Sequence, residues 1–122
     1  MIPWLGRLGR SFRCAFAGLV CLIQTQSNAR IHLLAVAVVV AAGAWLGISA
    51  TEWCMVTLAC GMVIAAEALN TAVEHLADRV TTEKDERIRM AKDVAAAGVL
   101  VAASAALIIG LIIFLPRLIG KL

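Results

Sequence analysis

The 122-residue chain has few of the residues that build linkers and metal clusters. It contains no tyrosine, 2 prolines and 9 glycines, and charged residues make up 16% of it. So little linker material argues against a disordered or multidomain protein. The 4 cysteines show no CxxC spacing and lie in apolar stretches, so we expect them to pack as small hydrophobic side chains: Cys14, Cys21, Cys54 and Cys60.

Two nucleotide-related patterns are also absent. The net charge of +3 comes from scattered Arg and Lys, without the basic patch interleaved with aromatic residues that would indicate nucleic-acid binding. No GxxxxGK[ST] run occurs, so any bound nucleotide must be held by side chains and a metal ion without a phosphate loop.

Apolar residues are abundant instead, at 62% of the chain with a mean hydropathy of +0.94. Charge-free runs cover residues 31–51 and 94–116, and each is long enough to cross a bilayer, which takes about 20 residues. A third run is cut short by Glu67, so it spans only if its helix continues through Glu67 and Asn70. We predict one all-α integral membrane domain, residues 1–122, with spans at 31–50, 53–78 and 94–115.

Basic residues set the expected orientation. They gather before the first span and between the second and third: Arg7, Arg10, Arg13, Arg30, Arg79, Lys84, Arg87, Arg89 and Lys92. The link between the first two spans has none, and the tail has two. The positive-inside rule therefore places the N-terminus and the connection 79–93 in the cytoplasm. The arginines before the first span also argue against a cleavable signal peptide.

Residues 1–28 predict an amphipathic helix. At the helical period, large apolar residues such as Phe12 and Phe16 fall on one side, while Arg7, Arg10 and Arg13 fall on the other. An apolar stripe beside a basic face suits a helix lying on the membrane surface. The alternative is a helix that packs against its own bundle.

The second span carries a line of polar residues. At 3.6 residues per turn they share one face that rises about 16 Å toward the cytoplasm: Glu67, Asn70, Thr71, Glu74 and Asp78. A carboxylate near hydrocarbon is costly, so it usually faces a bundle interior and marks function. The deepest, Glu67, suits a general base, and Glu74 and Asp78 suit a hard cation such as Mg²⁺. The alternative is a set of interhelical hydrogen bonds.

The start of the third span adds a second polar group. Lys92 and Asp93 are expected level with Glu74 and Asp78 if the two helices are antiparallel, which predicts a pocket for a metal-bound polyphosphate. Thr82, three residues before Asp85, predicts a capping box at the start of that helix. The two histidines, His32 and His75, are interpreted as interfacial residues outside the site.

The pattern Glu67-x-x-Asn70-Thr71-Ala72-x-Glu74-x-x-x-Asp78, followed by Ala91-Lys92-Asp93-x-Ala95-Ala96, resembles the small prokaryotic diacylglycerol kinase family, which includes undecaprenol kinases. The resemblance covers nearly the whole chain. It implies a homotrimer of three-span protomers, each with a surface helix, and active sites shared between neighbours. It also implies ATP- and Mg²⁺-dependent phosphorylation of a membrane lipid hydroxyl.

The resemblance implies a role for each matching residue. Glu67 would be the base that takes the lipid hydroxyl's proton, and Asn70 would position the reacting groups. The remaining matches concern the nucleotide. Glu74 would hold Mg²⁺ with ATP, Lys92 and Asp93 would contact the phosphates and ribose, and Asp78 would support these contacts. Glu83 and Asp85 would lie at the adenine end, and Arg7 would also bind the nucleotide.

Two positions depart from the family pattern. Gln26 stands where the family has a metal-binding Glu, and Cys14 stands where it often has a nucleotide-stacking Tyr. A Gln carbonyl can still coordinate Mg²⁺, but it lacks the charge of a carboxylate. These departures leave open a catalytically weak or inactive membrane scaffold of the same fold.

A cation-coupled transporter subunit is a further alternative, because an intramembrane Glu often serves as a proton site. A transporter needs polar groups across both halves of the membrane. In the half of the second span before Glu67, the same face of the helix carries only apolar side chains: Val56, Cys60 and Val63. The strings Asn28-x-Arg30-Ile31-His32 and Lys92-Asp93-Val94-Ala95-Ala96 look more like the undecaprenol-kinase branch of the family. The resemblance therefore favours undecaprenol as the substrate, with diacylglycerol next.

Overall fold

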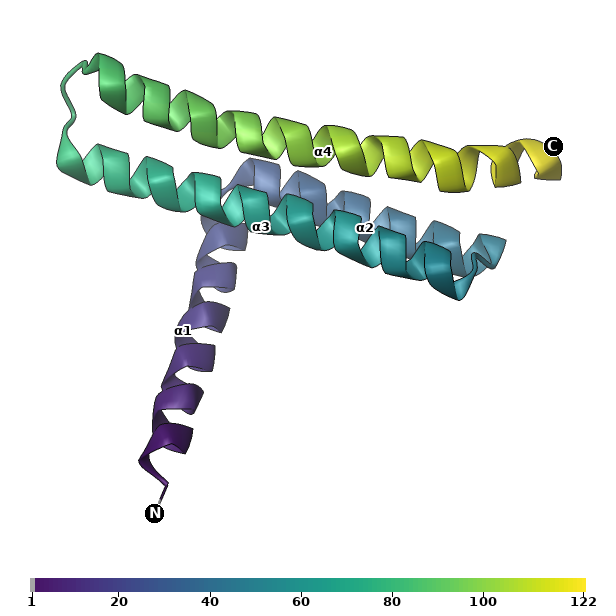
Figure 1. Cartoon of the computed structure of the whole chain (residues 1–122), viewed down its shortest axis with the longest axis horizontal. Helices are drawn as coiled ribbons and strands as arrows, with labels where there is room; N and C mark the ends of the chain where they lie inside the picture. Colours follow the sequence, from purple (N-terminus) through teal and green to yellow (C-terminus); the bar gives the residue numbers. More distant parts are fainter. Residues whose placement is uncertain (1) are drawn as a thin grey trace.

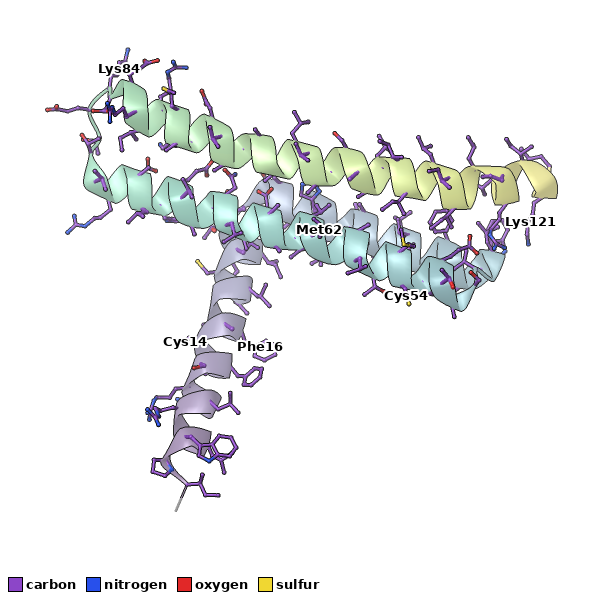
Figure 2. All side chains as sticks on the ribbon, viewed as in Figure 1. Cys14, Phe16, Cys54, Met62, Lys84 and Lys121 are labelled. Atoms are coloured by element: carbon purple, nitrogen blue, oxygen red, sulfur yellow. The ribbon has the colours of Figure 1, made fainter. Side chains whose placement is uncertain are left out.

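The computed structural model describes residues 2–122, which form four helices and no strand. These are α1 (Pro3–Thr25), α2 (Ser27–Leu46), α3 (Ala50–Val80) and α4 (Glu86–Lys121). Helices α2, α3 and α4 run alongside one another, and α1 leaves this bundle at a steep angle (Figure 1). The bundle has an α3–α4 end, marked by Lys84, and an α2–α3 end, near Lys121 (Figure 2).

Three of the helices, α2, α3 and α4, are long and apolar enough to cross a membrane. This confirms the predicted multi-pass membrane protein. Helix α3 reaches that length because it runs unbroken through Glu67 and Asn70 to Val80. The polar residues of the second span therefore lie on a continuous membrane helix.

A single residue separates α1 from α2. Gln26 has an extended backbone (φ −113°, ψ 114°), which ends one helix and starts the next in a new direction. The Arg30 Nη1 donates to the carbonyls of Ile23 (3.3 Å) and Gln24 (3.2 Å) near the end of α1. These bonds satisfy carbonyls that a helix end leaves without an intrahelical partner.

A tight turn joins α2 to α3. Gly47 ends α2 with φ 64°, the left-handed conformation that glycine adopts without steric cost. Ser49 then caps α3 in a reciprocal box with Glu52: the Ser49 hydroxyl accepts from the Glu52 amide (3.2 Å), and the Glu52 carboxylate accepts from the Ser49 amide (3.0 Å). The short turn fixes α2 and α3 as an antiparallel pair.

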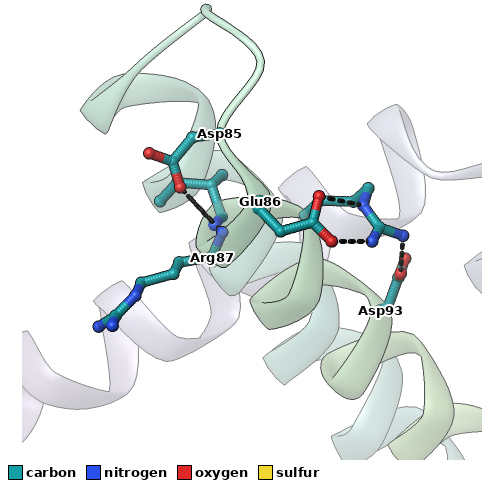
Figure 3. Close-up of polar contacts among 6 residues, drawn as sticks. Asp85, Glu86, Arg87 and Asp93 are labelled. Atoms are coloured by element: carbon teal, nitrogen blue, oxygen red, sulfur yellow. Dashed lines mark hydrogen bonds and ion pairs between the residues drawn. The ribbon is translucent and has the colours of Figure 1, made fainter.

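The connection predicted for residues 79–93 is mostly helical, because α3 ends at Val80 and α4 begins at Glu86. The predicted cap at Thr82 is wrong. Asp85 is the N-cap, and its carboxylate accepts from the amides of Arg87 (2.9 Å) and Ile88 (3.0 Å), as Figure 3 shows in part. Both residues can cap a helix, and the one that directly precedes the first helical turn does so.

The core lies toward the α2–α3 end, where Ile48, Val56 and Ile113 are buried against one another. Polar contacts close the same end: Arg117 of α4 pairs with Glu52 of α3, and the Lys121 ammonium lies 4.7 Å from the centre of the Trp45 ring. All four cysteines are free, and only Cys60 is partly buried. None of them forms a disulfide, and the other three lie on exposed helix surfaces.

One close contact in this core generates a stability prediction. Gly43 of α2 is buried, and a Cβ built on it would lie 2.8 Å from Cη2 of Trp53 and 3.1 Å from Cδ1 of Ile48. We expect Gly43→Ala to lower the free energy of unfolding by about 1–3 kcal/mol through overpacking. Thermal unfolding in detergent micelles measures the change.

The matched control is Gly61→Ala on α3, because a Cβ there would meet no atom within 4 Å. A glycine-to-alanine change at such a helical site stabilises by about 0.4–1 kcal/mol. Equal melting temperatures for the two variants would contradict the close approach of α2 and α3 at Gly43.

Candidate active site

The polar residues of α3 face the inside of the bundle at their deep end. The exposed fractions of Glu67, Asn70 and Thr71 are 2%, 8% and 7%. Further along the helix Glu74 is half-buried, and Asp78 is exposed at the α3–α4 end. The face thus runs from a buried carboxylate to an accessible one, as helical spacing requires.

Two buried side-chain atoms on this face have no hydrogen-bond partner within residues 2–122. They are Oδ1 of Asn70 and Oγ1 of Thr71. A buried polar atom without a partner costs about 1–3 kcal/mol, and native proteins rarely keep one without a use. These atoms are available to a ligand or to another copy of the chain.

His32 of α2 is the closest charged or chargeable neighbour of Glu67, with 3.8 Å between Nε2 and the Glu67 Oε2. The sequence interpretation left His32 out of the site, and the structure places it there. A signal existed: counting equally along both helices from their facing ends, Leu46 and Ala50, brings His32 within one helical turn of Glu67. The other histidine, His75, was also left out of the site, and it is exposed on α3.

The α3–α4 end brings other predicted residues together. The Lys92 Nζ lies 2.5 Å from Oδ1 of Asp78, so these two side chains are level across the helix pair, as expected for antiparallel helices. They border a polar cavity of about 650 Å³ formed by the end of α3, the connecting loop and the start of α4. Glu83 and Asp85 also line this cavity.

Arg89 also lines the polar cavity, and the sequence interpretation gave it no role in the site. Its Nη1 lies 3.3 Å from Oδ2 of Asp93, and its guanidinium also pairs with Glu86 (Figure 3). Asp93 is therefore engaged by Arg89 and is not among the residues that line the cavity. Charged residues one helical turn apart are the signal that predicts such pairs.

The structure does not bring Arg7 or Gln26 to this cavity. Arg7 lies on the part of α1 that extends away from the bundle (Figure 1), and Gln26 is half-buried at the junction of α1 and α2. Each remains a predicted site residue.

The carboxylates fit one type of metal site. Among residues 2–122 there is no group of three or more His, Cys, Asp or Glu placed to hold a metal ion. That argues against a zinc-type cage of protein ligands. Mg²⁺ commonly takes one or two carboxylates and fills its other positions with phosphate oxygens and water. Glu74, which forms no ion pair with the described residues, and Asp78 offer such oxygens about one turn apart on α3.

Comparison with known proteins shows the family of the chain. The family model described as prokaryotic diacylglycerol kinase matches residues 13–114. The chain is 38% identical over 114 residues to the undecaprenol kinase of Bacillus subtilis (strain 168), a match that covers 93% of each chain. It is also 38% identical over 111 residues to a diacylglycerol kinase of Synechocystis sp., covering 90% of this chain and 63% of that longer one.

The matched region contains the whole polar face of α3 and the Lys92 and Asp93 pair, and it leaves Arg7 outside. A buried carboxylate, a charged connection between α3 and α4 and three apolar helices thus occur in a sequence that matches a lipid kinase family over most of its length. The chain belongs to the prokaryotic diacylglycerol kinase family and is a lipid kinase.

Proposed function

We propose that the protein transfers the γ-phosphoryl group of Mg²⁺-bound ATP to the hydroxyl of a membrane lipid at the cytoplasmic surface of the inner membrane. The observation that carries the proposal is the shared face of α3, which joins the buried Glu67 to the polar cavity at Asp78 and Lys92. A lipid hydroxyl approaches from the bilayer and a nucleotide from water, so their sites must meet along such a face.

At the lipid end, Glu67 accepts the proton from the attacking hydroxyl, and Asn70 positions the reacting groups. The free Oδ1 of Asn70 supports this role, because it is a buried acceptor one turn from Glu67. General-base assistance requires a carboxylate within hydrogen-bond reach of the hydroxyl, and Glu67 lies where the apolar and polar parts of α3 meet.

At the nucleotide end, Lys92 binds the phosphates as a point charge, and Glu74 holds Mg²⁺ with Asp78 beside it. Glu83 and Asp85 line the far side of the cavity, where the adenine would lie. Asp93, Arg7 and Gln26 complete the proposed nucleotide and metal contacts. Bound Mg²⁺ supplies neutralising charge at the γ-phosphate during transfer.

The spacing along α3 sets the direction of approach. Glu67 and Asp78 are separated by about 16 Å of helix, and Glu74 lies between them, about 10 Å from Glu67 along the axis. The polyphosphate therefore extends from Lys92 past Glu74 toward Glu67, with the γ-phosphate at its deep end. This arrangement places adenine near water and the transferred group near the lipid.

A homotrimer completes the proposal. On the side of α3 opposite Glu67, exposed residues repeat with alternating spacings of three and four: Met55, Leu58, Met62, Ala65, Leu69, Ala72 and Leu76. That spacing is typical of helices that pack at a small left-handed crossing angle. Helices α3 from several copies would pack along this seam, while α1 lies on the cytoplasmic membrane surface with Arg7 near the nucleotide.

Undecaprenol is the proposed acceptor, with diacylglycerol second. The relative that this chain covers nearly end to end is named an undecaprenol kinase. The string Asn28-x-Arg30-Ile31-His32 supports the same choice, and its His32 lies beside Glu67.

Replacing the proposed base tests the reaction. We expect Glu67→Gln to lower kcat by about 10²–10⁴-fold, because the amide cannot accept the hydroxyl proton. The measurement is transfer from labelled ATP with Mg²⁺ to undecaprenol and to diacylglycerol in mixed micelles. Glu52→Gln, the same change on the same helix but at the α2–α3 end, should keep most of the activity.

Full activity in Glu67→Gln would remove Glu67 as the base. Absence of transfer to either lipid by the folded wild-type protein at high Mg²⁺ would contradict the proposed function itself.

A second variant tests the neighbour of Glu67. We expect His32→Gln to lower kcat by about 10-fold with an unchanged KM for ATP, because His32 contacts the lipid end of the site and lies far from Lys92. His75→Gln is the control, since that imidazole is exposed. A raised KM for ATP with unchanged kcat in His32→Gln would show that the histidine acts on the nucleotide instead.

A further inference from the structure

The polar cavity at the α3–α4 end has more carboxylates than cations in its lining. Asp78, Glu83, Asp85 and Glu86 supply four carboxylates, whereas the basic side chains number three. A nucleotide polyphosphate is itself an anion, so it needs cations that face it directly. Bound Mg²⁺ offsets only part of that charge, because a triphosphate carries more charge than one divalent ion neutralises. Basic side chains of the cavity must therefore supply the rest.

The three basic side chains are those of Lys84, Arg89 and Lys92. Lys84 lies in the connection between α3 and α4, at the end of the bundle (Figure 2). Arg89 and Lys92 lie three residues apart on α4, so they are neighbours on one side of that helix, about 4.5 Å apart along its axis. Two cations at this spacing can contact successive phosphates of one nucleotide.

Arg89 has two acidic partners on its own helix. Its Nη1 lies 3.3 Å from Oδ2 of Asp93, and its guanidinium also pairs with Glu86 (Figure 3). The exposed fractions of the Arg89, Glu86 and Asp93 side chains are 62%, 71% and 66%. Exposed ion pairs of this type contribute little free energy, so a stronger anion can replace the carboxylates. A phosphate is such an anion, because a guanidinium can bind two of its oxygens at once.

The position of the guanidinium identifies the phosphate that it reaches. Contact with Asp93 places it about one helical turn beyond the Arg89 backbone, toward Lys92. In the proposed function the adenine lies near the connecting loop, Asp93 contacts the ribose, and Lys92 binds the phosphates. The Arg89 guanidinium therefore lies where the ribose is joined to the first phosphate.

We propose that Arg89 binds the α-phosphate of the nucleotide, exchanging its ion pair with Asp93 for the phosphate oxygens. The proposal rests on the proposed function and adds to it a binding residue. Once released, the Asp93 carboxylate accepts a hydrogen bond from the ribose, which its contact with Arg89 otherwise opposes. Glu86 competes with the phosphate for the same guanidinium. Nucleotide binding thus assembles the ribose contact and the α-phosphate contact together.

Equilibrium binding tests the role of Arg89 without phosphate transfer. The probes are Mg²⁺-ATP and Mg²⁺-ADP, titrated by calorimetry into the purified full-length protein in micelles without a lipid substrate. We expect Arg89→Gln to raise the Kd of each nucleotide by about 10-fold, the effect of losing a hydrogen bond to a charged group. The two losses should be equal, because ATP and ADP share the α-phosphate. In turnover, the KM for ATP should rise with kcat unchanged, because Arg89 does not reach the γ-phosphate.

Glu86→Gln separates phosphate binding from a purely structural role of the ion pairs. The change removes a competing carboxylate, so it should lower the Kd of both nucleotides by about two- to threefold. If the pairs only stabilised the start of α4, Glu86→Gln and Arg89→Gln would change the Kd in the same direction. Arg89→Lys keeps the charge and loses the planar fork, so its Kd should lie between those of the wild type and Arg89→Gln. It also serves as the test variant if Arg89→Gln fails to fold.

Arg87→Gln is the matched control. Arg87 is exposed near the start of α4, forms no ion pair with the described residues and does not line the cavity. Figure 3 shows its side chain pointing away from Glu86 and Asp93. This variant should bind both nucleotides as the wild type does.

Equal Kd values for Arg89→Gln and Arg87→Gln would overturn the proposal. A loss of affinity for ATP without a loss for ADP would also overturn it, because the guanidinium would then act on the γ-phosphate. Both results leave the proposed function standing. Wild-type protein that binds neither nucleotide would contradict the proposed function itself, so the two failures are distinguishable.

Discussion

The arrangement of this protein depends on one constraint, the burial of the Glu67 carboxylate in a membrane helix. Hydrocarbon cannot solvate a carboxylate, so the face of α3 that carries Glu67 must turn inward. His32 of α2 lies beside it, and Asn70 and Thr71 are buried on the same side with free polar atoms. The orientation of α3 in turn leaves its opposite side exposed for other contacts.

The two ends of the bundle differ in chemistry as a consequence. At the α2–α3 end, the Glu52 and Arg117 pair, the Lys121 and Trp45 contact and the apolar core hold the helices together. At the α3–α4 end, Lys92 and Asp78 meet over a polar cavity that side chains do not fill. Stabilising contacts and open polar space are thus separated along the same helices, which suits chemistry at one membrane surface and gives no polar path across.

Local patterns in the sequence predict much of this arrangement, because helical period is a local property. The spacing of Glu67, Asn70 and Asp78 predicts their common face, and the apolar runs predict three spanning helices. Contacts between helices are harder to predict. The approach of His32 to Glu67 depends on the register set by the Gly47 turn, and the meeting of Lys92 with Asp78 depends on the path of the connection between α3 and α4. An apolar cavity between α2, α3 and α4 results from small side chains on separate helices, and no single segment predicts it.

The most direct test of a catalytic centre on one side of the membrane is phosphate transfer from ATP to lipid in sealed proteoliposomes. Protease cleavage of the N-termini that face outward first determines the fraction of protomers in each orientation. ATP and Mg²⁺ are added only outside the vesicles. The account predicts phosphorylated lipid in proportion to the fraction of protomers whose N-terminus and α3–α4 connection face outward. Transfer in proportion to the opposite orientation would contradict it.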